Sequence, residues 1–134
     1  MTYFADLTPY KYGGEKPRPD VLNIGWLSIA EPFESATPDR RLLNALAELI
    51  SKPQNLYRGF HTCEFCPAPP SKMTRHGIAL PDWPPETRGN GEIRVLASSG
   101  LTYVAPVLVL HYVAVHHYRP PQQFIDAAIG SVSR

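Results

Sequence analysis

The sequence contains little cysteine, no long apolar run and no excess of charge of either sign. Two cysteines in 134 residues are too few for the disulfide framework that supports many small secreted domains. The longest apolar run, from Tyr103 to Leu110, is interrupted by Pro106 and falls well short of the ~18 residues of a membrane-spanning helix. We therefore expect no association with a membrane.

The beginning of the chain, from Met1 to Asp6, also lacks a basic region followed by an apolar stretch. A secretory signal peptide needs both features. Without a signal peptide or a disulfide framework, the sequence predicts a cytoplasmic protein, in which thiols stay reduced.

The formal net charge is +1, and no run of basic residues is longer than two. Surfaces that bind nucleic acid need clustered lysine and arginine side chains to neutralise phosphates. We therefore expect no nucleic-acid partner. A protein partner is possible on this composition, and the oligomeric state stays open.

Proline is abundant, with 15 residues, more than twice its usual share of ~5%. Because apolar residues make up 43% of the chain, these prolines predict ordered loops between short elements rather than disorder. We expect one domain over residues 1–134, with an irregular amino-terminal arm at 1–20, a proline-rich loop at 67–88 and a frayed tail at 130–134.

Hydrophobic patterning predicts the α+β class. Thr37 as a cap and Pro38 at the first helical position predict an amphipathic helix through Ile50, ended by Pro53. Five other elements are expected from apolar runs, turn residues and prolines: strands at 21–27 and 56–60, a β-hairpin from 92–96 and 101–104, and helices at 106–117 and 122–129.

The two cysteines, Cys63 and Cys66, have the spacing of a zinc knuckle, in which the backbone turns so that both sulfurs face one metal ion. Histidines separated by three to five residues usually complete such a site, and His111 and His116 are separated by four. The sequence therefore predicts a tetrahedral Zn2+ site formed by these four side chains.

The order of knuckle, β-hairpin and helix is similar to that of treble-clef and ββα zinc fingers. The segment between Cys66 and His111 is, however, much longer than the ~12 residues of a short finger. The resemblance concerns only the order of elements and the types of ligand.

Other ligand sets are open. Residues five apart on a regular helix differ by about 140° in direction, so His111 and His116 converge only if the last turn widens. In an extended segment His61 projects to the same side as Cys63, which makes His61 an alternative ligand. A site without metal, with two buried thiols or a redox-active pair, is a further alternative.

Two classes of function follow. In the first, four protein ligands close the site, the Zn2+ is structural, and the domain surface binds a protein. In the second, the chain is a zinc-dependent hydrolase or deaminase-like enzyme, with His61, Cys63 and Cys66 as ligands and Glu64 or Glu92 as the base. The deaminase pattern itself is not met, because Cys63 rather than glutamate stands two residues after His61.

Three segments, 58–66, 89–95 and 111–121, together resemble a family of small bacterial proteins of unknown function. The likeness extends over nearly the whole chain, including residues 2–7. It implies a free-standing domain in which residues of these motifs matter most. It brings no assigned reaction.

Overall fold

The computed structural model describes residues 3–10, 18–54, 61–67, 72–74, 77–79 and 85–132. Within these residues the chain forms a small single domain that combines three helices with a four-stranded sheet and two smaller sheets. The predicted α+β class is confirmed.

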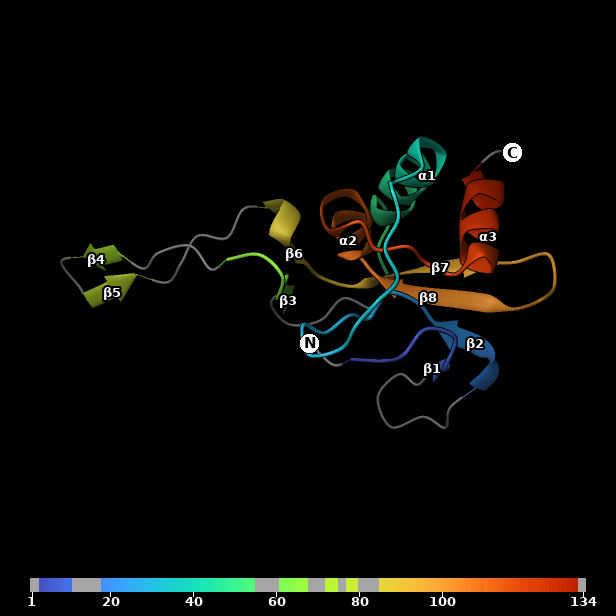
Figure 1. The fold of residues 1–134 in the computed structure, drawn as a ribbon, viewed down its shortest axis with the longest axis horizontal. Helices are drawn as coiled ribbons and strands as arrows, with labels where there is room; N and C mark the ends of the chain where they lie inside the picture. The colour runs from blue at the N-terminus through green and yellow to red at the C-terminus, as the bar shows by residue number, and fades with distance from the viewer. Residues whose placement is uncertain are drawn as a thin grey trace.

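The four-stranded sheet has the order β1-β2-β8-β7 (Figure 1). Its strands are β1 (Pro9–Tyr10), β2 (Arg18–Asn23), β7 (Glu92–Leu96) and β8 (Thr102–Pro106). The pairs β1–β2 and β7–β8 are antiparallel, whereas β2 and β8 are parallel. The predicted β-hairpin is therefore present, and it occupies one edge of the sheet.

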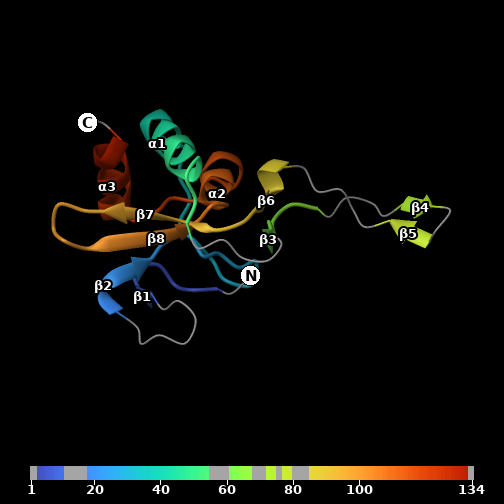
Figure 2. The ribbon, with the colours of Figure 1, turned by 180° about the vertical axis from the view of Figure 1, so that it is seen from behind.

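Three helices, α1 (Arg40–Ile50), α2 (Val109–His116) and α3 (Gln122–Val132), lie on one side of β7 and β8 (Figures 1 and 2). None of the helices in the described residues is long and apolar enough to cross a membrane. Ile93 and Val95 face the helices and are almost fully buried. Side chains alternate along a strand, so Glu92 and Arg94 face the opposite side of the sheet.

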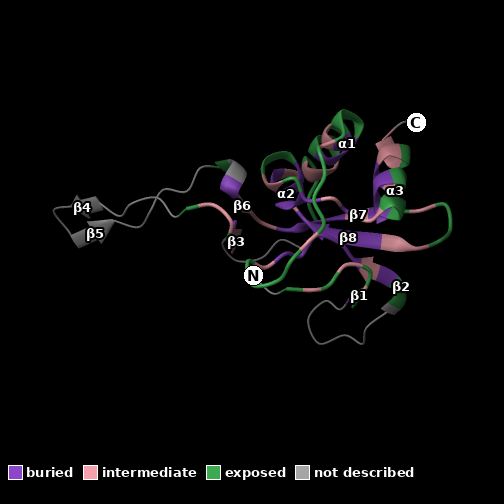
Figure 3. Cartoon of the chain, in the orientation of Figure 1, coloured by how far each residue is buried: buried purple, intermediate pink, exposed green. Residues whose placement is uncertain are grey.

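The main core fills the space between the sheet and the helices (Figure 3). Its largest buried side chains include Ile24, Leu46, Ile93, Tyr103, Val109, Tyr112, Val113, Tyr118 and Phe124. A smaller core lies on the other side of the sheet, where Phe4 packs against buried Tyr10, Val21, Trp26 and Val104. Helix α1 contributes Leu42 and Leu46 to the main core, as its leucine spacing predicts.

Several smaller elements come between α1 and β7 in the sequence. Strand β3 (His61–Thr62) pairs with β6 (Arg88–Gly89), which directly follows the short helix η1 (Pro85–Thr87). Strands β4 (Lys72–Thr74) and β5 (Gly77–Ala79) form a hairpin that lies away from the central sheet in Figure 1. The proline-rich segment 67–88 is therefore not a plain loop.

The start of α1 differs from the prediction. Asp39, not Thr37, is the cap residue, and its carboxylate accepts a hydrogen bond of 2.8 Å from the Arg41 backbone N–H. That bond lowers the pKa of Asp39. The backbone at Asp39 is extended, which brings its short carboxylate within reach of the first unpaired backbone N–H groups of the helix. Because Asp39 is the cap, Pro38 lies outside the helix.

The start of α2 also differs, because β8 continues through Pro106 and the helix begins at Val109. Pro106 lies opposite Glu92, whose backbone N–H donates to the Gln54 carbonyl, away from β8. The missing N–H of Pro106 therefore costs the sheet no hydrogen bond.

Several other boundaries differ. Strand β2 ends at Asn23 rather than residue 27, because Gly25 has a left-handed φ of 72°. The arm at 1–20 is partly regular, since it includes β1 and the start of β2. Residues 130–132 continue α3, so this part of the predicted tail is helical. The predicted strand at 56–60 lies outside the described residues.

Candidate metal centre

The segment that carries the two cysteines is positioned by β3 and by the turn that follows it. The Cys63 backbone N–H donates a 2.7 Å hydrogen bond to the carbonyl of Thr87, next to β6. Cys63 is only 1% exposed and belongs to the main core, whereas Cys66 is half-buried. The knuckle is thus joined to the strand that leads into β7.

The two histidines come from α2. His111 is buried in the first half of the helix, and His116 is its last residue. The last turn is wide, because the backbone N–H groups of both His117 and Tyr118 donate to the carbonyl of Tyr112. This widening turns His116 toward His111, and their Nε2 atoms are 3.2 Å apart.

The sulfur atoms lie against these nitrogens. The Sγ atom of Cys66 is 3.2 Å from Nε2 of His111 and 3.4 Å from Nε2 of His116. The Sγ atom of Cys63 is 3.4 Å from Nε2 of His116. All four donor atoms lie within 4.8 Å of one another, so these residues could hold a metal ion.

The spacing can be compared with tetrahedral coordination. Zn–S and Zn–N bonds of ~2.3 and ~2.05 Å at tetrahedral angles separate two nitrogens by ~3.3 Å and a nitrogen from a sulfur by ~3.6 Å. The observed separations of 3.2 Å between nitrogens and 3.2–3.4 Å between sulfur and nitrogen are close to these values. Four of the six separations among the donor atoms therefore suit one tetrahedral ion, and the other two are within 4.8 Å.

Burial sets the protonation of the metal-free centre. Burial, with a smaller contribution from the adjacent Cys66, raises the pKa of the Cys63 thiol to about 11. Burial also lowers the pKa of His116, as does the neighbouring His117. Both groups are therefore uncharged near neutral pH, and a bound cation would have to displace the thiol proton.

Aromatic rings enclose the centre. The Phe65 ring, between the two cysteines, lies 5.3 Å from the His116 ring and 5.9 Å from the Tyr112 ring, measured between centroids. Phe33 packs edge-on against both Phe65 and Tyr118. The sequence analysis missed this enclosure; an aromatic residue between the two cysteines was the only local indication of it.

The alternative site residues do not belong to the four-residue group. His61 is in β3 and is not a member of the four-residue group. Glu64 is exposed, and its Oε1 accepts a 3.0 Å hydrogen bond from the Ile29 backbone N–H. Glu92 is fully buried, and its Oε1 accepts a 2.7 Å hydrogen bond from the Tyr10 hydroxyl. Neither glutamate belongs to the group.

Comparison with known proteins gives one match. A family model described as a domain of unknown function (DUF7919) matches residues 2–129, which include all four residues of the centre. No curated protein and no solved structure matches the chain.

Proposed function

The chain belongs to this family of domains of unknown function, and we propose that it is a zinc protein in which the metal is structural. Cys63, Cys66, His111 and His116 would be the ligands. The observation that carries the proposal is the convergence of four donor atoms from two segments 45 residues apart in sequence. Four protein ligands complete a tetrahedral shell and leave no position for a reactive water.

Zinc is the metal that this donor set favours. A tetrahedral pair of thiolates with a pair of imidazoles is typical of structural zinc sites, and harder cations such as Mg2+ and Ca2+ prefer oxygen ligands. A reducing cytoplasm would keep Cys63 and Cys66 available as thiols, so we include that location in the proposal.

The metal would hold the knuckle against α2. Between these ligands the chain passes through η1, β6 and the β7–β8 hairpin, so the ion would close a loop that includes one edge of the sheet. In small zinc modules, metal binding contributes roughly 10–16 kcal/mol of apparent folding free energy. We expect a smaller share here, because the main core also forms from residues remote from the centre.

The hydrolase or deaminase-like alternative gains less support from the geometry. It requires His61 as the third ligand and a glutamate beside an open coordination position. His116 rather than His61 lies with the cysteines, and both candidate bases accept hydrogen bonds from other groups. A closed site is therefore the arrangement that we propose.

Metal analysis and X-ray absorption test this proposal. We expect one zinc per chain, with two sulfur ligands at ~2.3 Å and two nitrogen ligands at ~2.0 Å. Cys66→Ser should lose most of the metal, because it removes one ligand from a half-buried position. His61→Ala, the matched control, should retain the metal. Three protein ligands with an oxygen in the fourth position would instead support the enzyme.

The proposal includes a protein partner, and an apolar cleft beside the centre supports it. The cleft has a volume of about 370 Å³ and lies between α1 and α2, with His111 in its wall. Its other described lining residues are Leu43, Ile50, Pro85, Arg88, Val107, Leu108, Leu110, Ala114 and Val115. Because most of these side chains are aliphatic, an aliphatic segment of a partner protein fits this cleft best.

Val115→Glu tests the partner, because this side chain lines the cleft and is 53% exposed. Ile29→Glu is the matched control, since Ile29 is 65% exposed and does not line the cleft. We expect a protein that copurifies with the wild type and with Ile29→Glu to be lost from Val115→Glu, with zinc content unchanged. Equal retention by all three proteins would contradict a partner at this cleft.

A further inference from the structure

The four-stranded sheet ends at β7, and most of the outer edge of β7 has no strand beside it in the described part of the chain. Among the described residues, Gln54 pairs with this edge. Its backbone N–H donates to the Glu92 carbonyl at 2.7 Å, and the Glu92 N–H donates to the Gln54 carbonyl at 2.8 Å. Both backbone groups of Glu92 therefore point away from β8.

The backbone N–H and C=O groups of the other β7 residues alternate in direction along the strand. The Gly91 carbonyl accepts from Val107, and the Ala97 N–H donates to Leu101, so the odd-numbered residues bond toward β8. In an antiparallel ladder the even-numbered residues then point outward. The N–H and C=O groups of Arg94 and Leu96 consequently lie on the open edge of the sheet.

Space beside this edge would admit another strand. A cleft of about 380 Å³ adjoins Ile93 and Arg94, between the carboxyl-terminal ends of α1 and α3. A second cleft, of about 400 Å³, shares Ser131 with the first and continues over Leu96. Clefts therefore adjoin β7 at Ile93, Arg94 and Leu96, beyond the residue that pairs with Gln54.

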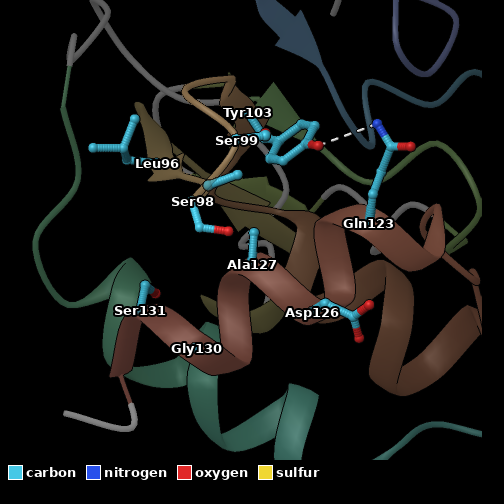
Figure 4. A pocket seen from close by; sticks show the side chains of 10 residues that line it. Leu96, Ser98, Ser99, Tyr103, Gln123, Asp126, Ala127, Gly130 and Ser131 are labelled. Carbon is cyan, nitrogen blue, oxygen red and sulfur yellow. Dashed lines mark hydrogen bonds between the residues drawn. The ribbon is translucent and has the colours of Figure 1, made fainter.

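The side chains around the second cleft are mostly small (Figure 4). Those of the β7–β8 turn are Ser98 and Ser99, and they lie across the cleft from Ala127, Gly130 and Ser131 of α3. A Cβ atom built on Gly130 would meet no other atom within 4 Å. Small residues on both walls leave the region next to Leu96 uncrowded.

We propose that this edge pairs with the same edge of a second copy of the chain. The two β7 strands would run antiparallel, with Arg94 opposite Leu96 of the partner subunit and Val95 on the two-fold axis. The two symmetry-related Arg94–Leu96 pairs would each exchange two backbone hydrogen bonds. The two four-stranded sheets would then become one continuous sheet.

The open edge is short. Its length favours this register, and it favours a second copy of the chain as the partner. Arg94 and Leu96 are the outward-facing residues of β7 beyond Glu92, and the proposed register satisfies both on each copy. Placing Arg94 opposite Arg94 of the partner subunit would bring like charges together and direct the partner strand into Gln54. A long extended peptide would meet the same obstruction, whereas the short β7 strand of a second copy ends before it.

Sedimentation over a dilution series of the zinc-loaded full chain tests the proposal. We expect a reversible monomer–dimer equilibrium for the wild type. Leu96→Pro removes the outward N–H and no hydrogen bond to β8, so this variant should be monomeric. Leu96→Thr keeps the N–H and replaces the exposed side chain, so it should still dimerise.

Each other outcome overturns the pairing. A wild-type monomer at every concentration would exclude it, and a dimer that persists in Leu96→Pro would place the interface elsewhere. Loss of the dimer in both variants would indicate a side-chain contact instead of strand pairing. Amide hydrogen exchange needs no variant: exchange at Arg94 and Leu96 should slow severalfold as concentration rises, and rates independent of concentration would refute the proposal.

Discussion

At the scale of single residues, the centre depends on how His116 reaches His111. Their separation of five positions corresponds to about 140° around a regular helix, which would point the rings apart. They meet because His116 ends α2, where the Tyr112 carbonyl accepts two wide-turn hydrogen bonds. The position of His116 at the helix end therefore matters as much as its spacing from His111.

The proximity of these four side chains could be predicted from the sequence, because the residue types and spacings that suit a metal ion are restricted. The choice of His116 over His61 depended on tertiary structure, and the spacing alone left both open. The enclosure by Phe33, Phe65 and Tyr112 could not be predicted, since it joins a loop, the knuckle and a helix that are distant in sequence.

At the scale of elements, the end of α2 contains an unfavourable backbone conformation. His117 has φ 58° and ψ 29°, the left-handed conformation, in which a side chain costs about 1 kcal/mol. Its carbonyl accepts a 2.9 Å hydrogen bond from the Ala36 backbone N–H, which holds the preceding loop in place. Glycine is the usual residue at such a position.

His117→Gly should therefore raise the free energy of unfolding by about 0.5–1 kcal/mol, because glycine adopts this conformation without strain. For a domain of this size we expect the melting temperature to rise by roughly 2–4 °C, measured by thermal denaturation of the zinc-loaded protein. Zinc content should not change, because His117 is not a member of the four-residue group.

His117→Val is the matched comparison, since a β-branched residue tolerates the left-handed region poorly and should lower the melting temperature. A loss of zinc in His117→Gly would instead show that the side chain contributes to the metal site. An unchanged or lower melting temperature in His117→Gly would contradict the strain argument.

Elements with strong local patterns could be predicted from the sequence, and those that depend on distant partners could not. The β7–β8 hairpin and the leucine face of α1 follow from alternation and periodicity. The parallel pairing of β2 with β8 joins residues far apart in the chain, so no local pattern reveals it. The predicted start of α2 was wrong because Pro106 suits two different places. It fits the first position of a helix, and it also fits the last pair of the β7–β8 ladder, where β7 needs no hydrogen bond from its missing N–H.

At the scale of the whole molecule, the end of α2 connects the centre to the amino-terminal arm. The Tyr118 hydroxyl donates a 2.7 Å hydrogen bond to Oδ2 of Asp6, and Oδ1 of Asp6 accepts from the Gly25 backbone N–H at 2.9 Å. Val109 lies only 3.0 Å from a Cβ built on Gly25, and Gly25 has a φ of 72°, so a larger residue would be both crowded and strained where this loop meets α2. The metal and the arm would therefore both hold the end of α2 in place.

The metal should contribute a large part of the free energy of unfolding, but not all of it. Much of the main core, including Leu46, Tyr103 and Phe124, comes from elements that do not carry ligands. A ligand present at about a thousand times its dissociation constant stabilises the folded state by about 4 kcal/mol. Removing zinc with a chelator should therefore lower the melting temperature by roughly 10–20 °C, and adding zinc should restore it.

This difference in melting temperature between zinc-loaded and chelated protein should shrink as pH falls. Because burial raises the pKa of Cys63 to about 11, zinc binding releases the thiol proton throughout the neutral range. Each unit of acidification then weakens apparent affinity by about tenfold for each proton displaced. The pKa of His116 is lowered by burial, so its imidazole stays neutral below the usual value of 6.5 and is protonated only in more acidic solution.

Thermal denaturation in matched buffers from about pH 8 to about pH 5 measures the effect of the Cys63 thiol and that of the His116 imidazole together. The zinc-dependent increment should be largest at the alkaline end, decline steadily through neutrality and disappear once the His116 imidazole is protonated. Cys66→Ser is the control, because a centre without its second thiolate should show little increment at any pH. An increment that grows on acidification, or a wild type whose melting temperature ignores the chelator, would contradict coordination by buried thiols and imidazoles.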